Sequence, residues 1–310
     1  MTTDPREHHD EPSGGPSADE VFEEHRRALT GAAYRILGSW TDAEDVVQDV
    51  WLRWAAGHAT VADPSRWLST VTVRAALDRL RRLKSARERY LGPWLPEPIS
   101  DDPGPEATAE RRDTLALGML VVLESLSPLE RTVFVLREGF AWSNADIAEA
   151  LGKSQDAVRQ LAHRAQHHVR QARPRFTVDR DLAAASTELF LRACLDGNVQ
   201  NLLEVLAPDV VMISDGGGEA PAPRRALVGA DQVLAFLAGL GRKDAFAGAT
   251  FAIGTVNAQP GLITCIDDAV VSAMSFDTDA QGRITAIYVV AAPSKLTHLA
   301  PPATPRPNIA

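Results

Sequence analysis

The chain has 310 residues, of which 45% are hydrophobic, so it can form two or three domains with buried cores and is not disordered throughout. Its net charge of −9 argues against a uniformly basic nucleic-acid binder, and its two distant cysteines argue against a disulfide framework or a zinc site and favour a reducing cytoplasm. No apolar run reaches the roughly 20 residues of a membrane span, and the N-terminus lacks the apolar core of a signal peptide. We expect no metal, no cofactor and no membrane contact.

The charges are segregated along the chain. Residues 74–90 hold seven Arg or Lys against two acidic residues, and residues 153–175 hold six against one. Residues 178–310 hold nine basic and fourteen acidic residues. Two basic stripes on an acidic molecule predict a protein that contacts DNA only when something else holds it in place.

The first part of the chain is predicted to be a tail followed by helices. Residues 1–18 have the composition of a disordered tail, and residues 19–90 show helical periodicity. Thr41 is the predicted N-cap of a helix that ends at Gly57, and Asp63 with Pro64 starts a helix that runs towards Arg89. The first of these helices has an acidic outer face made of Asp42, Asp45, Gln48 and Asp49.

Residues 91–112 contain five prolines and two glycines and are predicted to be a linker. Trp94 and Leu95 form an apolar pair within it. An apolar pair in a linker usually docks on a neighbouring surface, and we expect the same here.

Residues 113–175 are predicted to form a second helical domain that contains a helix-turn-helix. A capping box starts at Ser127, a short helix opens at Ser143, Gly152 makes the turn, and Ser154 caps a helix over residues 155–172. Its outer face is predicted to carry Gln155, Asp156, Arg159, Gln160, His163 and Arg164. Arg and Gln can read base edges in the major groove. An ordinary helical hairpin with a solvated basic face is the alternative.

Two other features are weaker by themselves. The basic half of the helix after Pro64 could follow a DNA backbone, with the loop before it holding an unstacked base, but a charged helix is more often simply solvated. The acidic face of the preceding helix could bind a basic protein surface, although surface helices commonly carry such faces.

Residues 178–299 are predicted to form an α+β domain. One helix over about 181–206, broken near Gly197, precedes five strands and a hairpin turn at residues 277–283. The predicted strands are Val210–Ser214, Thr250–Asn257, Leu262–Ile266, Val270–Asp277 and Ile284–Ala291. Residues 300–310 are a Pro-rich tail.

Taken in order, these features resemble the extracytoplasmic-function sigma factors of the sigma-70 family. Residues 22–54 and 64–82 resemble their region 2, residues 125–170 resemble their region 4, and the resemblance covers about residues 20–173. It implies a factor that binds core RNA polymerase, through the β′ clamp and the β subunit, and directs initiation at promoter DNA.

The resemblance also implies roles for individual residues. Asp45, Gln48 and Asp49 become candidates for binding the β′ clamp helices of the polymerase. Region 2 would recognise the −10 element through Arg74, Arg79, Arg81 and Arg82. Region 4 would recognise the −35 element through Gln155, Arg159, Gln160, His163 and Arg164.

The C-terminal domain resembles the SnoaL-like fold, a cone-shaped α+β barrel, which a subgroup of these sigma factors carries. The marks of this subgroup are WLPEP at residues 94–98, DGGGE at 215–219 and APSKL at 292–296. Two departures stand out: Glu219 replaces an expected lysine, and Ala292 and Ser294 replace an expected Asn and Asp. The expected fold is thus two all-α sigma domains followed by this α+β domain.

We expect the C-terminal domain to regulate the sigma domains by direct intramolecular contact. The candidate interface residues are Trp94, Leu95, Asp215, Gly216, Gly217 and Gly218. Binding of a small-molecule ligand is a second interpretation. Catalysis by Asp215, or by Asp267 and Asp268, is a third and less favoured one, because these residues have the pattern of turns, and we therefore expect no catalytic residue.

A helix-turn-helix repressor with a ligand-binding C-terminal domain is the alternative outside the sigma factors. It accounts for residues 140–173 and for the α+β domain. It leaves the acidic helix face and the basic helix after Pro64 without a use. Such a repressor would bind its operator tightly without polymerase.

Overall fold

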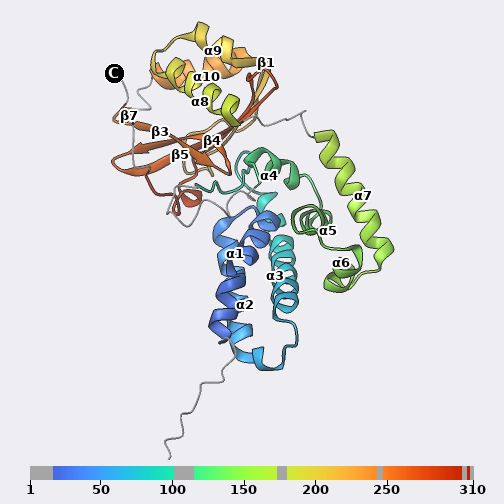
Figure 1. Ribbon diagram of the computed structural model, residues 1–310. Coiled ribbons are helices and arrows are strands. Elements are labelled where there is room, and N and C mark those ends of the chain that lie inside the picture. The colour runs from blue at the N-terminus through green and yellow to red at the C-terminus, as the bar shows by residue number, and fades with distance from the viewer. Residues whose placement is uncertain (1–16, 101–114, 173–179, 243–246, 302–305, 308–310) are drawn as a thin grey trace, which may run out of the picture.

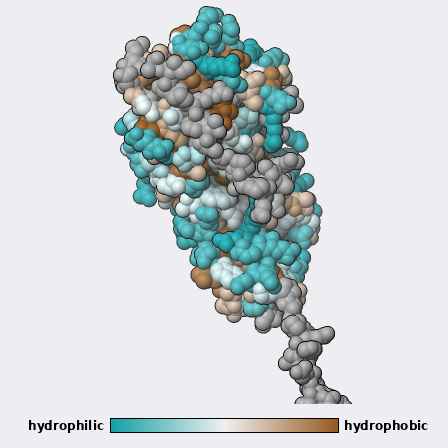
Figure 2. Space-filling model, turned by 60° about the vertical axis from the view of Figure 1, so that its left-hand side comes forward, coloured by the Kyte–Doolittle hydropathy of each residue, from teal (hydrophilic) through white to brown (hydrophobic). Residues whose placement is uncertain are grey.

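The computed structural model describes residues 17–100, 115–172, 180–242, 247–301 and 306–307. Most of the predicted N-terminal and C-terminal tails, the second half of the predicted linker and Pro174 lie outside these residues. Figure 1 shows helices from the first half of the chain below an α+β domain formed by the second half. No helix in the described ranges is long and apolar enough to cross a membrane. The surface in Figure 2 is largely hydrophilic, with hydrophobic residues exposed in small patches.

Three helices form the N-terminal unit, which packs around one apolar core. Phe22, Ile36, Val50, Trp54 and Leu68 are among its buried residues. The unit consists of α1 (Ala18–Leu37), α2 (Trp40–Gly57), the short 3₁₀ helix η1 (His58–Thr60) and α3 (Pro64–Arg87). The predicted start of α3 at Asp63 and Pro64 is confirmed, since the Asp63 side chain accepts a hydrogen bond from the backbone N–H of Arg66.

The predicted N-cap of α2 is wrong by two residues. Ser39, not Thr41, has the extended backbone of an N-cap, and its hydroxyl accepts a hydrogen bond from the N–H of Asp42. The reason is the sharp turn before it. Gly38 ends α1 with a left-handed backbone (φ 69°), so α2 begins at once and Thr41 already lies in its first turn.

The second helical unit contains the predicted helix-turn-helix. Its elements are α4 (Leu117–Glu124), α5 (Pro128–Phe134), the π-helical turn η3 (Val135–Gly139), α6 (Asn144–Leu151) and α7 (Gln155–Ala172). The capping box at Ser127 and the cap at Ser143 are confirmed. Gly152 makes the turn between α6 and α7 with φ 60°, a conformation that favours glycine.

The C-terminal domain is a seven-stranded sheet with three helices, so the expected order of two helical units and one α+β domain is confirmed. Its helices are α8 (Arg180–Leu195), α9 (Val199–Val205) and α10 (Ala230–Arg242). Its strands are β1 (Leu206–Asp215), β2 (Leu227–Val228), β3 (Thr250–Val256), β4 (Gln259–Ile266), β5 (Ala269–Thr278), β6 (Ile284–Val290) and β7 (Arg306–Pro307). A short 3₁₀ helix, η4 (Pro293–Lys295), follows β6.

The sheet is open, which corrects the expectation of a barrel. Its strand order is β2-β1-β6-β5-β4-β3-β7, so β2 and β7 are edges that do not pair with each other. Only β1 and β6 run parallel among the described pairs. The five predicted strands and the break near Gly197 are confirmed, whereas α10 and β2 were not predicted.

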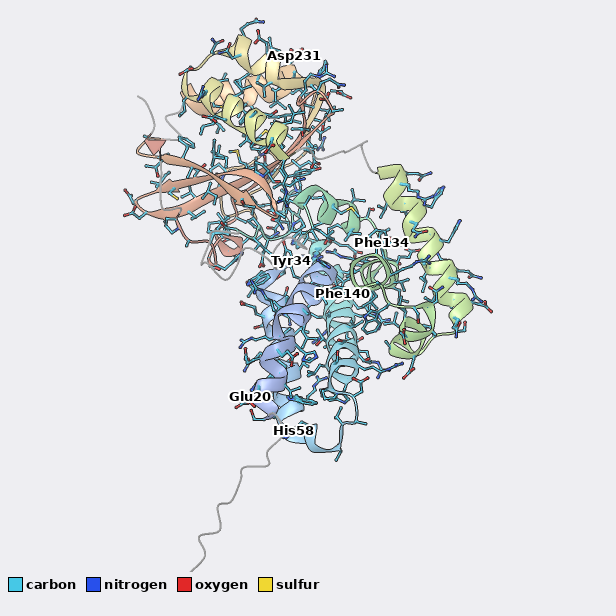
Figure 3. All side chains as sticks on the ribbon, viewed as in Figure 1. Glu20, Tyr34, His58, Phe134, Phe140 and Asp231 are labelled. Atoms are coloured by element: carbon cyan, nitrogen blue, oxygen red, sulfur yellow. The ribbon has the colours of Figure 1, made fainter. Side chains whose placement is uncertain are left out.

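The two faces of the sheet have different partners. One face packs against α8, α9 and α10 through an apolar cluster that includes Phe190, Met212, Met274 and Phe276. The other face packs against α4 and the linker, and Ala273, Tyr288 and Val290 on this face belong to the same apolar cluster as the helical units. In Figure 3, Tyr34 at the end of α1 lies beside the sheet, while Glu20 and His58 lie at the far end of the N-terminal unit.

Helix α4 approaches strand β5 so closely that a side chain at one glycine position would displace its neighbour. A Cβ atom on Gly118 would overlap the carboxylate of Asp277. This carboxylate is buried and accepts a hydrogen bond from the Tyr288 hydroxyl at 2.8 Å. Burial raises the pKa of Asp277 to about 6, against the opposing effect of Tyr288. The contact therefore combines tight packing with a carboxyl group that is costly to bury.

We predict that Gly118→Ala lowers the free energy of unfolding of the full chain by about 1–3 kcal/mol, because the added methyl group overpacks the contact between α4 and β5. Helix propensity alone would act in the opposite direction by about 1 kcal/mol. Gly239→Ala is the matched control, since nothing lies within 4 Å of a Cβ at this position in α10. Urea unfolding measures both variants, and equal stabilisation by both would contradict the close approach.

Candidate nucleic-acid interface

The outer face of α7 is available to a partner. Gln155, Arg159, Gln160 and His163 are exposed, while Val158, Leu161 and Ala165 on the opposite side are buried. Ile147 and Ala148, on the inward side of α6, are also buried. The structure therefore brings the predicted base-reading residues together on one exposed helix face, as a recognition helix requires.

Two of the arginines on α7 already have partners within the chain. Arg159 forms an ion pair with Asp156, one turn earlier on the same helix. The Nε of Arg164 donates to Glu130 Oε1 at 2.7 Å, which ties α7 to the first turn of α5. Arg164 thus also stabilises the helix-turn-helix itself, a contact that the sequence did not predict.

The four candidate arginines of α3 do not share one face. Arg81 and Arg82 are exposed, and within the described residues each hydrogen-bonds to Asp78 on its own helix. Arg79 points towards α2, where its guanidinium pairs with Asp42 and lies 4.0 Å from Asp45. Arg74 lies on the side of α3 that contacts α6. Only two of the four are therefore free of contacts with other helices in this arrangement.

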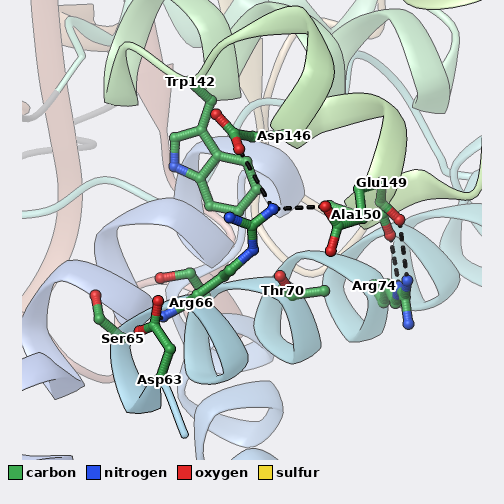
Figure 4. A pocket seen from close by; sticks show the side chains of 10 residues that line it. Asp63, Ser65, Arg66, Thr70, Arg74, Trp142, Asp146, Glu149 and Ala150 are labelled. Atoms are coloured by element: carbon green, nitrogen blue, oxygen red, sulfur yellow. Dashed lines mark hydrogen bonds and ion pairs between the residues drawn. The ribbon is translucent and has the colours of Figure 1, made fainter. Parts of the chain in front are cut away.

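The side chains of Arg66 and Arg74 form hydrogen bonds and ion pairs with residues of helix α6 (Figure 4). Arg74 donates to the backbone carbonyls of Ala150, at 2.5 Å, and Glu149, at 3.2 Å. Arg66 contacts the carboxylates of Glu149, at 2.6 Å, and Asp146, at 3.4 Å. Arg74 thus binds carbonyls at the C-terminus of α6, where the helix carries partial negative charge, whereas Arg66 binds side-chain carboxylates.

A polar cavity of about 260 Å³ lies beside this contact. Asp63, Thr70 and Trp142 line it together with both arginines and with the acidic residues of α6. Carboxylates and carbonyl oxygens thus pair with both guanidinium groups, while the two side chains stay partly exposed. We name the four contacts of Arg66 and Arg74 with Asp146, Glu149 and Ala150 the α3–α6 contact.

The predicted polymerase-binding residues Asp45, Gln48 and Asp49 are exposed on α2. On the opposite side of this helix Ala43, Val46 and Val50 are buried. The three residues therefore form one accessible acidic and polar face.

The linker residue Glu97 binds the N-terminus of α2. Its carboxylate accepts hydrogen bonds from the backbone N–H groups of Trp40 and Thr41, at 2.8 and 3.0 Å, and from the hydroxyls of Ser39 and Thr41. A carboxylate at this position satisfies donors that the helix leaves unpaired and interacts favourably with its dipole. Glu97 belongs to the WLPEP motif and is the only acidic residue among residues 91–100, but its sequence context does not reveal this role.

Leu95 and Trp94 dock next to Glu97, as expected for an apolar pair in a linker. Leu95 is buried, and the Trp94 ring lies between the Arg87 guanidinium, 3.6 Å from its centroid, and the Lys295 ammonium, 4.0 Å away. Cations over the face of an indole ring are favourable, more so when they are shielded from water. Trp94 therefore joins α3 to the end of the C-terminal domain.

Lys295 and Asp215 form a buried ion pair at this junction. Lys295 Nζ lies 2.7 Å from Asp215 Oδ2 and also donates to the carbonyl of Leu95. Asp215 further accepts hydrogen bonds from the Tyr90 hydroxyl and the Leu95 N–H. Burial lowers the pKa of Lys295 to about 8, although Asp215 acts to raise it. Burial also raises the pKa of Tyr90.

The glycines after Asp215 lie against the linker. Gly217 donates its N–H to Asp215, and a Cβ at Gly217 or Gly218 would crowd Tyr90 or Leu91, respectively. Two residues that depart from the expected motifs, Glu219 and Ser294, contact each other: the Ser294 hydroxyl donates a hydrogen bond to the Glu219 carboxylate at 2.8 Å. The structure therefore brings Trp94, Leu95, Asp215 and the three glycines into one cluster.

The residues weighed for catalysis do not form a reactive site. Asp215 is fully engaged with Lys295, Tyr90 and backbone N–H groups. Asp267 and Asp268 both have positive φ and make the turn between β4 and β5, as the sequence pattern indicated. Among the described residues no group of three or more His, Cys, Asp or Glu could hold a metal ion.

A second buried charge cluster joins the helical units. Glu124 in α4 pairs with Arg87 of α3, at 2.7 Å, and with Arg131 of α5. Arg131 is almost fully buried and also donates to the carbonyl of Arg35 in α1. Burial lowers the pKa of Arg87. These residues were not predicted, because isolated charges in helices give no sign of partners far along the chain.

Comparison with known proteins matches the chain to one kind of transcription factor. Residues 21–86 match the family model of Sigma-70 region 2, and residues 118–166 match that of Sigma-70, region 4. The chain is 37% identical over 290 residues to the ECF RNA polymerase sigma factor SigJ of Mycobacterium tuberculosis, covering 89% of this chain and 92% of that protein. It is 32% identical over 282 residues to a probable ECF RNA polymerase sigma factor, SigI, of the same organism, covering 89% and 93%.

The similarity extends to the structure. The crystal structure of M. tuberculosis SigJ matches with a TM-score of 0.71 and 34% identity, covering 89% of this chain and 97% of that chain. The match therefore includes the C-terminal α+β domain as well as the helical units.

We predict that Glu97→Gln destabilises the full chain by about 1.5–3 kcal/mol, because the charged acceptor of four hydrogen bonds at the start of α2 is lost. Hydrogen exchange should also accelerate at the amides of Trp40 and Thr41, which donate to Glu97. The control is Glu88→Gln, at an exposed position just after α3. Unchanged protection of both amides in Glu97→Gln would show that Glu97 does not hold this helix end.

Proposed function

This chain belongs to the extracytoplasmic-function sigma factors of the sigma-70 family, and we propose from this premise how its parts divide the work of transcription initiation. Sigma factors bind core RNA polymerase and promoter DNA, and they are not enzymes. The proposal rests on one observation above all: an exposed polar recognition helix, a basic helix and an acidic helix face occur on separate surfaces of the helical units.

In this proposal the acidic face of α2 binds the polymerase. Asp45, Gln48 and Asp49 dock on the clamp helices of the β′ subunit, with further contacts from the β subunit. Their exposure and the burial of the opposite side of α2 support this assignment. The proposal includes a cytoplasmic location, where the polymerase acts on the chromosome.

The two basic surfaces bind the promoter. Arg81 and Arg82 of α3, joined by Arg74 and Arg79 once their internal partners release them, contact the −10 element. Gln155, Arg159, Gln160 and His163 of α7 read the −35 element, with Arg164 at its edge. Arg and Gln on an exposed helix can form paired hydrogen bonds to guanine and adenine edges, which supports this role for α7.

The C-terminal domain restrains these surfaces. It holds α4 through the contact between Gly118 and Asp277, and it holds the linker through Trp94, Leu95, Asp215 and the loop of Gly216, Gly217 and Gly218. The α3–α6 contact then keeps the helix-turn-helix on the basic helix. A fused domain has a high effective concentration, so contacts of modest strength suffice for such control.

The α3–α6 contact therefore opposes promoter binding by the free protein. In it, Arg66 and Arg74 contact carboxylates and carbonyls that a phosphate backbone would have to replace. The −10 and −35 elements lie apart on the promoter, so α3 and α7 have to separate for both to be contacted at once. The restraint supports the expectation that this factor binds DNA well only with polymerase.

We predict that Glu149→Gln increases binding of a single-stranded −10 oligonucleotide by the free full chain up to about fivefold, because it removes an exposed ion pair worth about 0.2–1 kcal/mol. Fluorescence anisotropy at low salt measures this binding. Glu44→Gln is the control, since Glu44 is exposed on α2 and has no described contact with α3. Equal affinities for both variants and the parent chain would argue against masking of the basic helix.

The function is tested by transcription of a randomised promoter library with core RNA polymerase. We predict promoter-specific RNA with the full chain, a changed −35 preference with Arg159→Ala, and unchanged preference with Arg192→Ala, an exposed arginine of α8. A chain truncated after Pro174 should give a different yield if the C-terminal domain regulates the factor. Operator binding without polymerase, and no RNA from any chain, would favour the repressor.

A further inference from the structure

The C-terminal domain encloses a cavity that the sigma function does not use. It lies between the three helices and the sheet face turned away from the helical units, and its volume is about 370 Å³. Its walls include Phe190, Cys194, Leu202, Leu234, Phe251 and Met274. This volume falls within the range of about 300–1,000 Å³ that small-molecule sites occupy.

The side chains that line the cavity are apolar. Among the described lining residues none is an acid, a base or an amide, and the heteroatoms of their side chains are the sulfurs of Cys194 and Met274. Burial raises the pKa of the Cys194 thiol to about 12, so the thiol is neutral at physiological pH. None of the buried polar atoms without a partner in the described residues belongs to a lining residue. A charged ligand would therefore lose its hydration without compensation.

The cavity reaches the surface between α8 and α9. Val199 lines it and is half exposed, and Gly197 lines it at the left-handed turn between these helices. Water against such walls lacks hydrogen-bond partners, and covering apolar surface is favourable by about 25 cal/mol per Å². The site thus has an entrance and a driving force for an apolar occupant.

The cavity and the contact with α4 share strand β5. Met274 lines the cavity on one face of the strand. The adjacent residue Ala273 belongs to the apolar cluster of the helical units on the other face, and Asp277 contacts Gly118 of α4. A ligand that shifts Met274 therefore acts on the strand that α4 packs against.

We propose that this cavity binds an uncharged, predominantly aliphatic small molecule and that occupancy changes the stability of the contact between α4 and β5. The binding step does not depend on the proposed transcription function. The site binds without chemical conversion, because no lining side chain can transfer a proton at neutral pH.

The first test uses 1-alkanols from hexanol to dodecanol as probes on the full chain. Each added methylene should strengthen binding about fourfold, corresponding to 0.8 kcal/mol, until the cavity is full. Decanoate should bind more weakly than decanol because its carboxylate has no partner. Calorimetry measures both, and an affinity that does not depend on chain length would overturn the proposal.

The two cysteines provide a second readout on the unmodified chain. Cys194 lines the cavity, whereas Cys265 packs in a separate apolar cluster with Val256 and Ile263. Saturating decanol should slow the reaction of Cys194 with N-ethylmaleimide at least tenfold and leave Cys265 unchanged. Equal effects on both thiols would indicate non-specific action and overturn the site.

Substitutions that fill the cavity complete the test. Ala193→Leu and Leu202→Phe add volume to its wall and should abolish decanol binding, while Ala235→Leu on the exposed side of α10 should not. Circular dichroism identifies any variant that fails to fold, and the thiol readout does not depend on these variants. Decanol should also change hydrogen exchange of α4 by at least twofold, and binding without such a change would overturn the coupling to α4.

Discussion

The arrangement of this protein depends on the requirement that buried charges have partners. Lys295 and Asp215 are both buried, and each would be strongly destabilising without the other. Their other side-chain hydrogen bonds go to Leu95 in the linker, to Tyr90 just before it and to the N–H of Gly217. Because these bonds are directional, the linker, the end of β1 and the turn after β6 can satisfy all of them in only one relative position.

The same requirement connects the three folded parts. Glu97 accepts hydrogen bonds from the unpaired N–H groups at the start of α2. Glu124 and Arg131 join α4 and α5 to α1 and α3, and Asp277 packs against α4. An interface made of apolar contacts alone could slide, whereas paired charges specify register. Such pairs add less net stability than well-packed apolar residues would. The interface is therefore specific without being strongly stabilised, which agrees with the separation of the helical units that we propose.

Features set by local sequence could be predicted, and features set by distant contacts could not. The caps at Asp63, Ser127 and Ser143, the turn at Gly152 and five strands followed from residue types at fixed spacing. Helix α10 was missed because its short apolar pattern is interrupted by Gly239 and Gly241, and β2 because it has two residues. The motif residues around Trp94 and Asp215 were expected to meet. The contact of Lys295 with this cluster, and the roles of Glu97 and Arg66, join residues that lie 57 to 200 positions apart in the chain. The spacing of residues within a local motif does not reveal such contacts.

The position of Lys295 near the end of the chain has a consequence for synthesis. Its partner Leu95 precedes it by 200 residues. A ribosome adds roughly 5–20 residues per second, so about 10–40 s separate the appearance of these two residues. During that interval the linker has been made but the ammonium group that binds Leu95 and Asp215 has not, so this part of the contact between the linker and the C-terminal domain forms late in synthesis.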